Sequence, residues 1–158
     1  HNIITDLSFL SELKELRVLI LHSNRIVDIS PLSGLHNLEY LELFNNFIED
    51  LSPLKGLKRL LDLNICFNRC PDLSVRAHLT RLERLWLYNS NNRSREHPVD
   101  RELVKELRIA LPTCHIDDKS YSTHGGWRTH HRYYVVFNML HGVMDYLSWD
   151  AVGLVPSY

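Results

Sequence analysis

The sequence predicts an α/β fold: a right-handed solenoid of short parallel strands joined by 3-10 or short helical returns. Three observations predict it: a constant spacing of 22 residues, apolar pairs that alternate with other residues, and one asparagine at a fixed place in each copy. The copies begin at Leu16, Leu38 and Leu60. A period of this length is typical of stacked repeats, in which each coil buries its apolar residues against its neighbours.

Each copy contains one short predicted strand. Side chains along a strand alternate between its two faces, so both members of an apolar pair point into the coil and the residues between them point out. We expect the strands to lie on the concave face of the coil. The pairs are Leu19 with Leu21, Leu41 with Leu43, Leu63 with Ile65 and, in a fourth strand, Leu85 with Leu87.

The asparagines Asn24, Asn46 and Asn68 follow the strands, where the chain turns sharply. Such a turn leaves backbone groups inside a narrow coil, and an amide side chain carries both donors and an acceptor for them. We interpret these residues as a structural ladder rather than as catalytic groups.

The returns follow the asparagines. In the first two full copies they read Asp-Ile/Leu-Ser-Pro-Leu, which combines side chains that cap a turn with a proline suited to a first helical turn. In the third copy Val75 replaces Pro53 and Arg76 replaces Leu54, which predicts a fuller helical turn.

The pattern LxxLxLxxNxI followed by xDISPLxxL resembles the leucine-rich repeat, in the 22-residue variety of internalin-like bacterial proteins. The resemblance covers residues 2–90, with a looser match to about residue 116. It implies a scaffold that binds another protein, at the cell surface of a bacterium or outside the cell. A cytoplasmic location is the alternative.

The register divides the chain into leucine-rich repeats (1–90), a C-terminal cap (91–116) and a small C-terminal extension (117–158). Asn2 lies 22 residues before Asn24, so the first repeat is truncated and lacks its strand. We expect this sequence to be the C-terminal part of a longer protein.

The predicted cap has three parts. A polar loop follows Ser90, which stands where the next ladder asparagine is expected. An amphipathic helix is predicted over 98–111 from apolar residues at fourfold spacing, and a last strand over 113–116. A solenoid needs such an end to shield its last apolar layer. In the extension, a helix is predicted over 131–146.

Composition narrows the classes of partner. The formal net charge of −1 argues against nucleic acid or an anionic membrane as an obligatory partner. No apolar run reaches the roughly 18–20 residues that span a bilayer, so we expect no membrane insertion. Cys66 and Cys70 point in opposite directions in the repeat, so we expect both, and Cys114, to be free thiols.

The outward strand positions are the candidate binding surface. Tyr, Trp and Arg side chains dominate the energetics of protein interfaces, and this face contains all three types. We predict a non-catalytic scaffold that binds a partner protein here. The candidate residues are Ile20, His22, Tyr40, Glu42, Phe44, Asp62, Asn64, Arg84, Trp86 and Tyr88.

Three alternatives stay open. In the first, the rings of this face are covered by the C-terminal segment or only line the strand surface, and Trp86 is the most ambiguous of them. In the second, the face recognises a cell-wall or host glycan. In the third, the chain is a structural cap of a longer repeat array whose binding site lies upstream.

We predict no enzyme, no cofactor and no metal site. Catalytic motifs with a nucleophilic serine or a phosphate-binding glycine loop are absent, and Glu39, Glu42, Glu49 and Asp50 occupy repeat positions that do not converge. The histidines of the extension lack the spacing of zinc ligands; they are His124, His130, His131 and His141.

Overall fold

The computed structural model describes residues 3–70, 72–88 and 100–118. By its internal contacts the chain forms two compact units, His1–Ser120 and Tyr121–Tyr158. The following description concerns the first unit. The predicted extension, including the helix over 131–146, lies outside the described residues except for its first two positions.

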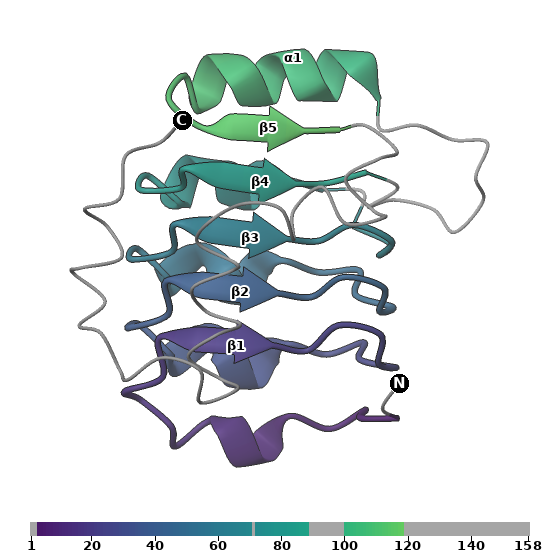
Figure 1. Cartoon of the computed structure of the whole chain (residues 1–158), viewed down its shortest axis with the longest axis vertical. Helices are drawn as coiled ribbons and strands as arrows, with labels where there is room; N and C mark the ends of the chain where they lie inside the picture. The colour runs from purple at the N-terminus through teal and green to yellow at the C-terminus, as the bar shows by residue number, and fades with distance from the viewer. Residues whose placement is uncertain (1–2, 71, 89–99, 119–158) are drawn as a thin grey trace, which may run out of the picture. The chain divides into compact units, whose positions relative to one another are not determined.

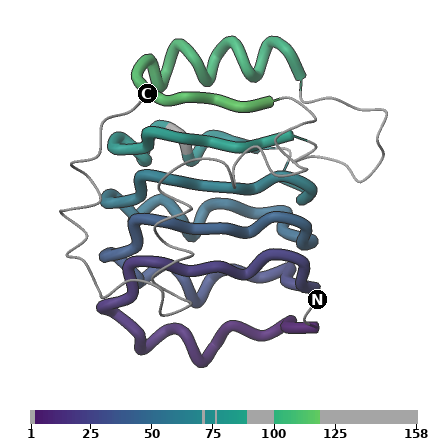
Figure 2. The backbone as a smooth tube through the Cα atoms, viewed as in Figure 1, coloured from purple at the N-terminus to yellow at the C-terminus, as the bar shows by residue number. Residues whose placement is uncertain are grey.

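Five short parallel strands form one sheet in chain order, and the coils that carry them follow one another from β1 to β5 (Figure 1). The tube in Figure 2 shows the same turn and return in successive coils. The inward residue of each strand pairs in register with that of the next, so these side chains form a column in the core: four leucines and, in β5, Ile116. The strands are β1 (Val18–Ile20), β2 (Tyr40–Glu42), β3 (Asp62–Asn64), β4 (Arg84–Trp86) and β5 (His115–Asp117). The predicted solenoid of parallel strands is confirmed.

The returns are 3-10 helices: η1 (Ser8–Leu10), η2 (Ser30–Gly34), η3 (Ser52–Gly56) and η4 (Ser74–His78). In η3, Asp50 accepts hydrogen bonds from the Ser52 backbone N–H and hydroxyl, both at 2.7 Å. The prediction of a fuller helical turn in the third copy is wrong, because η4 spans five residues like η2 and η3. The Asp-x-Ser cap, which Asp72 and Ser74 preserve, starts the same turn without a proline.

The asparagines tie each coil to its neighbour. Asn46 is fully buried, and its Nδ2 donates to the carbonyls of Leu21 at 2.9 Å and Leu43 at 3.0 Å. Its Oδ1 accepts from the Ile26 N–H at 3.1 Å. Asn68 repeats this pattern one coil further on, with Leu43, Ile65 and Ile48.

The helix α1 (Arg101–Ala110) packs against η4 and β5. It begins at Asp100, whose side chain accepts a hydrogen bond from the Glu102 N–H at 2.9 Å. Val104 and Leu107 are buried, so the helix covers the last apolar layer as a cap must. The last strand starts at His115 rather than at residue 113. The residues before it form a turn after the helix, in which the Cys114 N–H donates a hydrogen bond to the Leu111 carbonyl.

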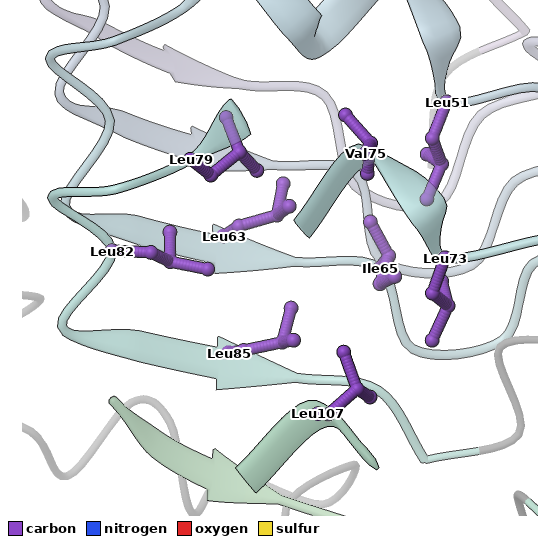
Figure 3. Close-up of a pocket in the computed structure, with 9 residues that line it drawn as sticks. All are labelled: Leu51, Leu63, Ile65, Leu73, Val75, Leu79, Leu82, Leu85 and Leu107. Carbon is purple, nitrogen blue, oxygen red and sulfur yellow. The ribbon is translucent and has the colours of Figure 1, made fainter. Parts of the chain in front are cut away.

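A small cavity of about 10 Å³ lies inside the core where the third repeat meets the cap (Figure 3). Arg76 stands at the register position of the buried Leu54, so this coil supplies one leucine fewer to the core. Val75, 4% exposed, points into the space instead. A cavity of this size without polar groups does not hold a water. The other lining residues are Leu51, Leu63, Ile65, Leu73, Leu79, Leu82, Leu85 and Leu107.

In the part of the chain that the structure describes, no helix is both long and apolar enough to cross a membrane.

Candidate interaction surface

The strand residues that point away from the core form columns on the concave face of the sheet. Parallel pairing sets Val18, Tyr40, Asp62, Arg84 and His115 side by side. A second column contains Ile20, Glu42, Asn64, Trp86 and Asp117. Residues 22 or more positions apart in sequence thereby become neighbours about 5 Å apart.

The centre of this surface is buried, including two of the candidate aromatic rings. Tyr40 and Trp86 are only 3% and 5% exposed. Glu42, Asp62 and Asn64 are buried as well, at 0%, 1% and 2%. All outward positions of β2 and β3 are buried. Strand β1, at the edge, keeps its outward positions half-buried.

Asn64 is held from within its own turn. Its Oδ1 accepts a hydrogen bond from the Cys66 N–H at 3.1 Å. Its Nδ2 is buried and has no hydrogen-bond partner among the described residues. A buried donor of this kind ordinarily has a partner in a folded protein.

Half-buried side chains surround the centre. They come from strands β1 and β4 and from the residues two positions after β1, β2 and β4. The members among the predicted residues are Ile20, His22, Phe44, Arg84 and Tyr88.

Phe67 joins two of these rings, and the sequence-based prediction missed it. Its ring lies edge-on to Phe44, with centroids 5.6 Å apart, and to Tyr88, at 5.9 Å. We call these three residues the aromatic ridge. Alignment of the repeats could have identified Phe67, because it occupies the place of Ser23 and Asn45, where an aromatic residue is unusual.

Strand β5 extends the surface by two positions that the prediction also missed. Asp117, 6% exposed, lies beside Trp86 in the register, and the exposed His115 lies beside Arg84. The predicted strand ended at Ile116, one residue before Asp117.

The carboxylates weighed as a catalytic pair do not converge. Glu39 is buried and binds Arg17 at 2.9 Å and Arg59 at 2.7 Å, at the edge where the strands begin. Glu49 and Asp50 are exposed on the other side of the coil, beyond the ladder asparagine. Glu39 therefore joins the first full repeat to the end of its own repeat and takes no part in the concave surface.

All three cysteines are free thiols, as predicted. Burial raises the pKa of Cys70 to about 12, and that of Cys114 likewise to about 12. Because the thiolate is the reactive form, these two side chains are poor nucleophiles at neutral pH.

No cluster of three histidine, cysteine, aspartate or glutamate side chains within the described ranges is arranged to hold a metal ion. The extension histidines weighed as ligands, His124, His130, His131 and His141, lie outside those ranges.

Comparison with known proteins agrees with this architecture. The family profile described as leucine-rich repeats (2 copies) matches residues 14–56. Internalin C2 of Listeria monocytogenes is 39% identical over 58% of this chain and 41% of its own, with a TM-score of 0.55. The chain contains leucine-rich repeats and is similar to internalins and other leucine-rich repeat proteins. Leucine-rich repeat proteins of this kind generally mediate protein–protein interactions.

Two further structures resemble the leucine-rich repeat chain over a longer stretch. An internalin (InlF) of L. monocytogenes is 33% identical over 75% of this chain and 33% of its own, with a TM-score of 0.61. A leucine-rich repeat protein of Leptospira interrogans is 32% identical over 74% and 29%, with a TM-score of 0.64. The chain thus spans less than half the length of each of these proteins. No curated protein sequence matches it.

Proposed function

We propose that this chain is a non-catalytic module that binds a partner protein on the concave face of its sheet. The observation that carries the proposal is the parallel register, which gathers the outward residues of four repeats and β5 into one surface. The repeat needs leucines and asparagines to fold, but it does not need a tyrosine, a tryptophan and charged residues at these outward positions. Their presence there favours recognition.

Two layers of residues have different roles in this proposal. The buried centre, which contains Tyr40, Asp62 and Trp86, holds the surface in one shape. The half-buried Phe44 and Tyr88 offer ring faces to a partner, and Arg84 offers a guanidinium group. Truncation of such an aromatic or arginine side chain to alanine often weakens binding by about 2 kcal/mol or more.

Photo-crosslinking tests the proposal. A benzophenone amino acid is placed at Phe44 or Tyr88, and the matched control carries it at Ser33, an exposed position in η2. Each variant is incubated with bacterial-envelope and host-cell surface proteins. We expect the same protein to be crosslinked from both concave positions and not from position 33. Phe44→Ala combined with Tyr88→Ala should then weaken binding of that protein while circular dichroism stays unchanged.

Three outcomes contradict the proposal. Equal crosslinking from position 33 indicates non-specific contact. An unchanged affinity of the double variant removes the concave face from consideration. Binding on a glycan array that is lost in the double variant, without any protein crosslink, assigns the face to a carbohydrate.

A further inference from the structure

A second surface runs along the edge where the strands end. The coils stay in register beyond the strands, because the N–H groups of Arg25, Phe47 and Arg69 each bond to the preceding coil at 2.8–3.0 Å. These three residues form a column in which a ring lies between two cations. Arg25 and Arg69 are exposed and Phe47 is half-buried.

Arg69 is held over a ring rather than neutralised. Its guanidinium carbon lies 5.1 Å from the centroid of the Phe47 ring, within the range of a cation–π contact. Its contact with the Glu49 carboxylate is long, 3.6 Å, between side chains that are 47% and 63% exposed. Exposed pairs of this kind contribute little, so the guanidinium donors stay accessible to another carboxylate.

Arg25 is the second cation of the column. Its side chain makes no hydrogen bond or ion pair with any residue in the described ranges. Asp28, three residues further on, hydrogen-bonds to Ser30 instead. An exposed guanidinium group offers five donors in a planar fork, which suits bidentate binding of a carboxylate.

Phe67 adds an aromatic side chain that the turn itself disfavours. Its φ of 53° lies in the left-handed region, which costs a residue with a side chain roughly 1–2 kcal/mol. The equivalent residues Ser23 and Asn45 are small and polar, and asparagine tolerates this conformation well. A bulky ring retained at a strained position points to a role beyond the fold. Here it places a half-buried ring two residues from Arg69.

We infer that Arg25, Phe47, Phe67 and Arg69 form an edge surface that binds a segment of a partner protein in which carboxylates flank an apolar or aromatic residue. The two arginines select the carboxylates by charge, and the two rings contact the apolar residue between them. This inference rests on the proposed function as a protein-binding module, but it uses the edge where the strands end, which meets the concave surface at Phe67.

The test uses the full chain and a phage-displayed peptide library. Selected peptides are synthesised with a fluorescent label, alongside copies in which Lys and Arg replace Glu and Asp. We expect the selected peptides to be acidic with aromatic residues, and the basic copies not to bind. Backbone NMR shifts on titration should map to the four edge residues and spare Ile20 and Arg84.

Charge reversal provides the matched control. Arg25→Glu and Arg69→Glu should each weaken peptide binding about tenfold, as expected for a charge that contacts the ligand directly. Arg81→Glu, at an exposed arginine before β4, should leave it unchanged. Binding should weaken as the salt concentration rises.

Several results overturn this inference: enrichment of basic peptides, equal effects of all three arginine variants, or tight binding of a uridine oligonucleotide that exceeds that of the peptides. None of these results changes the crosslinking expected from the concave positions Phe44 and Tyr88. Loss of those crosslinks with intact peptide binding at the edge contradicts the proposed concave site alone.

Discussion

At the scale of single residues, the fold depends on a few polar side chains inside an apolar coil. Asn46 satisfies buried backbone groups from two coils, and the Asp-x-Ser caps start each described return with the same pair of hydrogen bonds. Each of these contacts recurs with the repeat, so one substitution tests a rule that applies along the chain.

Asn46→Ala should lower the free energy of unfolding by at least about 1–3 kcal/mol, because the buried Ile26 N–H loses its partner. The Leu21 and Leu43 carbonyls each keep a hydrogen bond from a neighbouring ladder asparagine. Urea denaturation measures the loss. Asn37→Ala is the control, because the Asn37 side chain bonds to the Lys14 carbonyl at an exposed site. Equal losses in the two variants would contradict the structural role of Asn46.

The pKa of Asp50 lies below its ordinary value because the Ser52 hydroxyl and N–H donate to the carboxylate. Ser52→Ala should raise this pKa, and carboxyl carbon NMR measures it. The pKa of Asp6, lowered by Ser8, should not move. A depressed folded-state pKa stabilises the fold above the unfolded value, about 3.9, and this contribution disappears as the pH falls through the folded-state pKa. An Asp50 pKa that stays low in Ser52→Ala would assign the shift to the backbone N–H alone.

At the scale of elements, the third repeat and the cap are where this chain departs from its own period. Helix α1 covers η4 and β5, and the core beneath it contains the cavity beside Val75. The cavity lies in the repeat where Arg76 stands at the position of a core leucine.

Leu107→Ala should destabilise the protein by about 2–5 kcal/mol, the usual effect of removing a buried leucine side chain. Leu107 is fully buried, whereas Ile109 on the same helix is 73% exposed. Ile109→Ala should therefore change the melting temperature little. Equal melting temperatures for Leu107→Ala and Ile109→Ala would mean that α1 does not act as a cap.

Val75→Leu should stabilise the protein by roughly 1 kcal/mol, because one more methylene is buried and the cavity is filled. The control is Val27→Leu, at a valine that is 58% exposed. A lower melting temperature for Val75→Leu would mean that the cavity cannot accommodate the larger side chain.

At the scale of the described coils together, stability depends on neighbours on both sides. The first coil, with η1, has one neighbouring coil, and the coil of β3 has two. In such arrays stability is close to a sum of coil and interface contributions.

Amide hydrogen exchange should therefore be slower at Leu43 and Ile65, which bond to the next coil, than at Leu10 and Leu13, which bond within the first coil. Exchange followed by NMR measures the difference. One common exchange rate for all four amides would indicate that the coils open only together.

The period by itself determined the order of β1 to β4, the ladder asparagines and the inward leucines. Each of these depends on local geometry that repeats every 22 residues. It also placed the outward residues on one face, since alternation along a strand is a local rule.

Only the tertiary structure decided which outward residues are buried. The repeat pattern assigns both Tyr40 and Phe44 to outward positions, but Tyr40 is 3% exposed and Phe44 is half-buried. The aromatic ridge through Phe67 and the buried Glu39 between two arginines also appeared only there. Burial and side-chain pairing depend on contacts between coils, and those distances exist only once the coils are stacked.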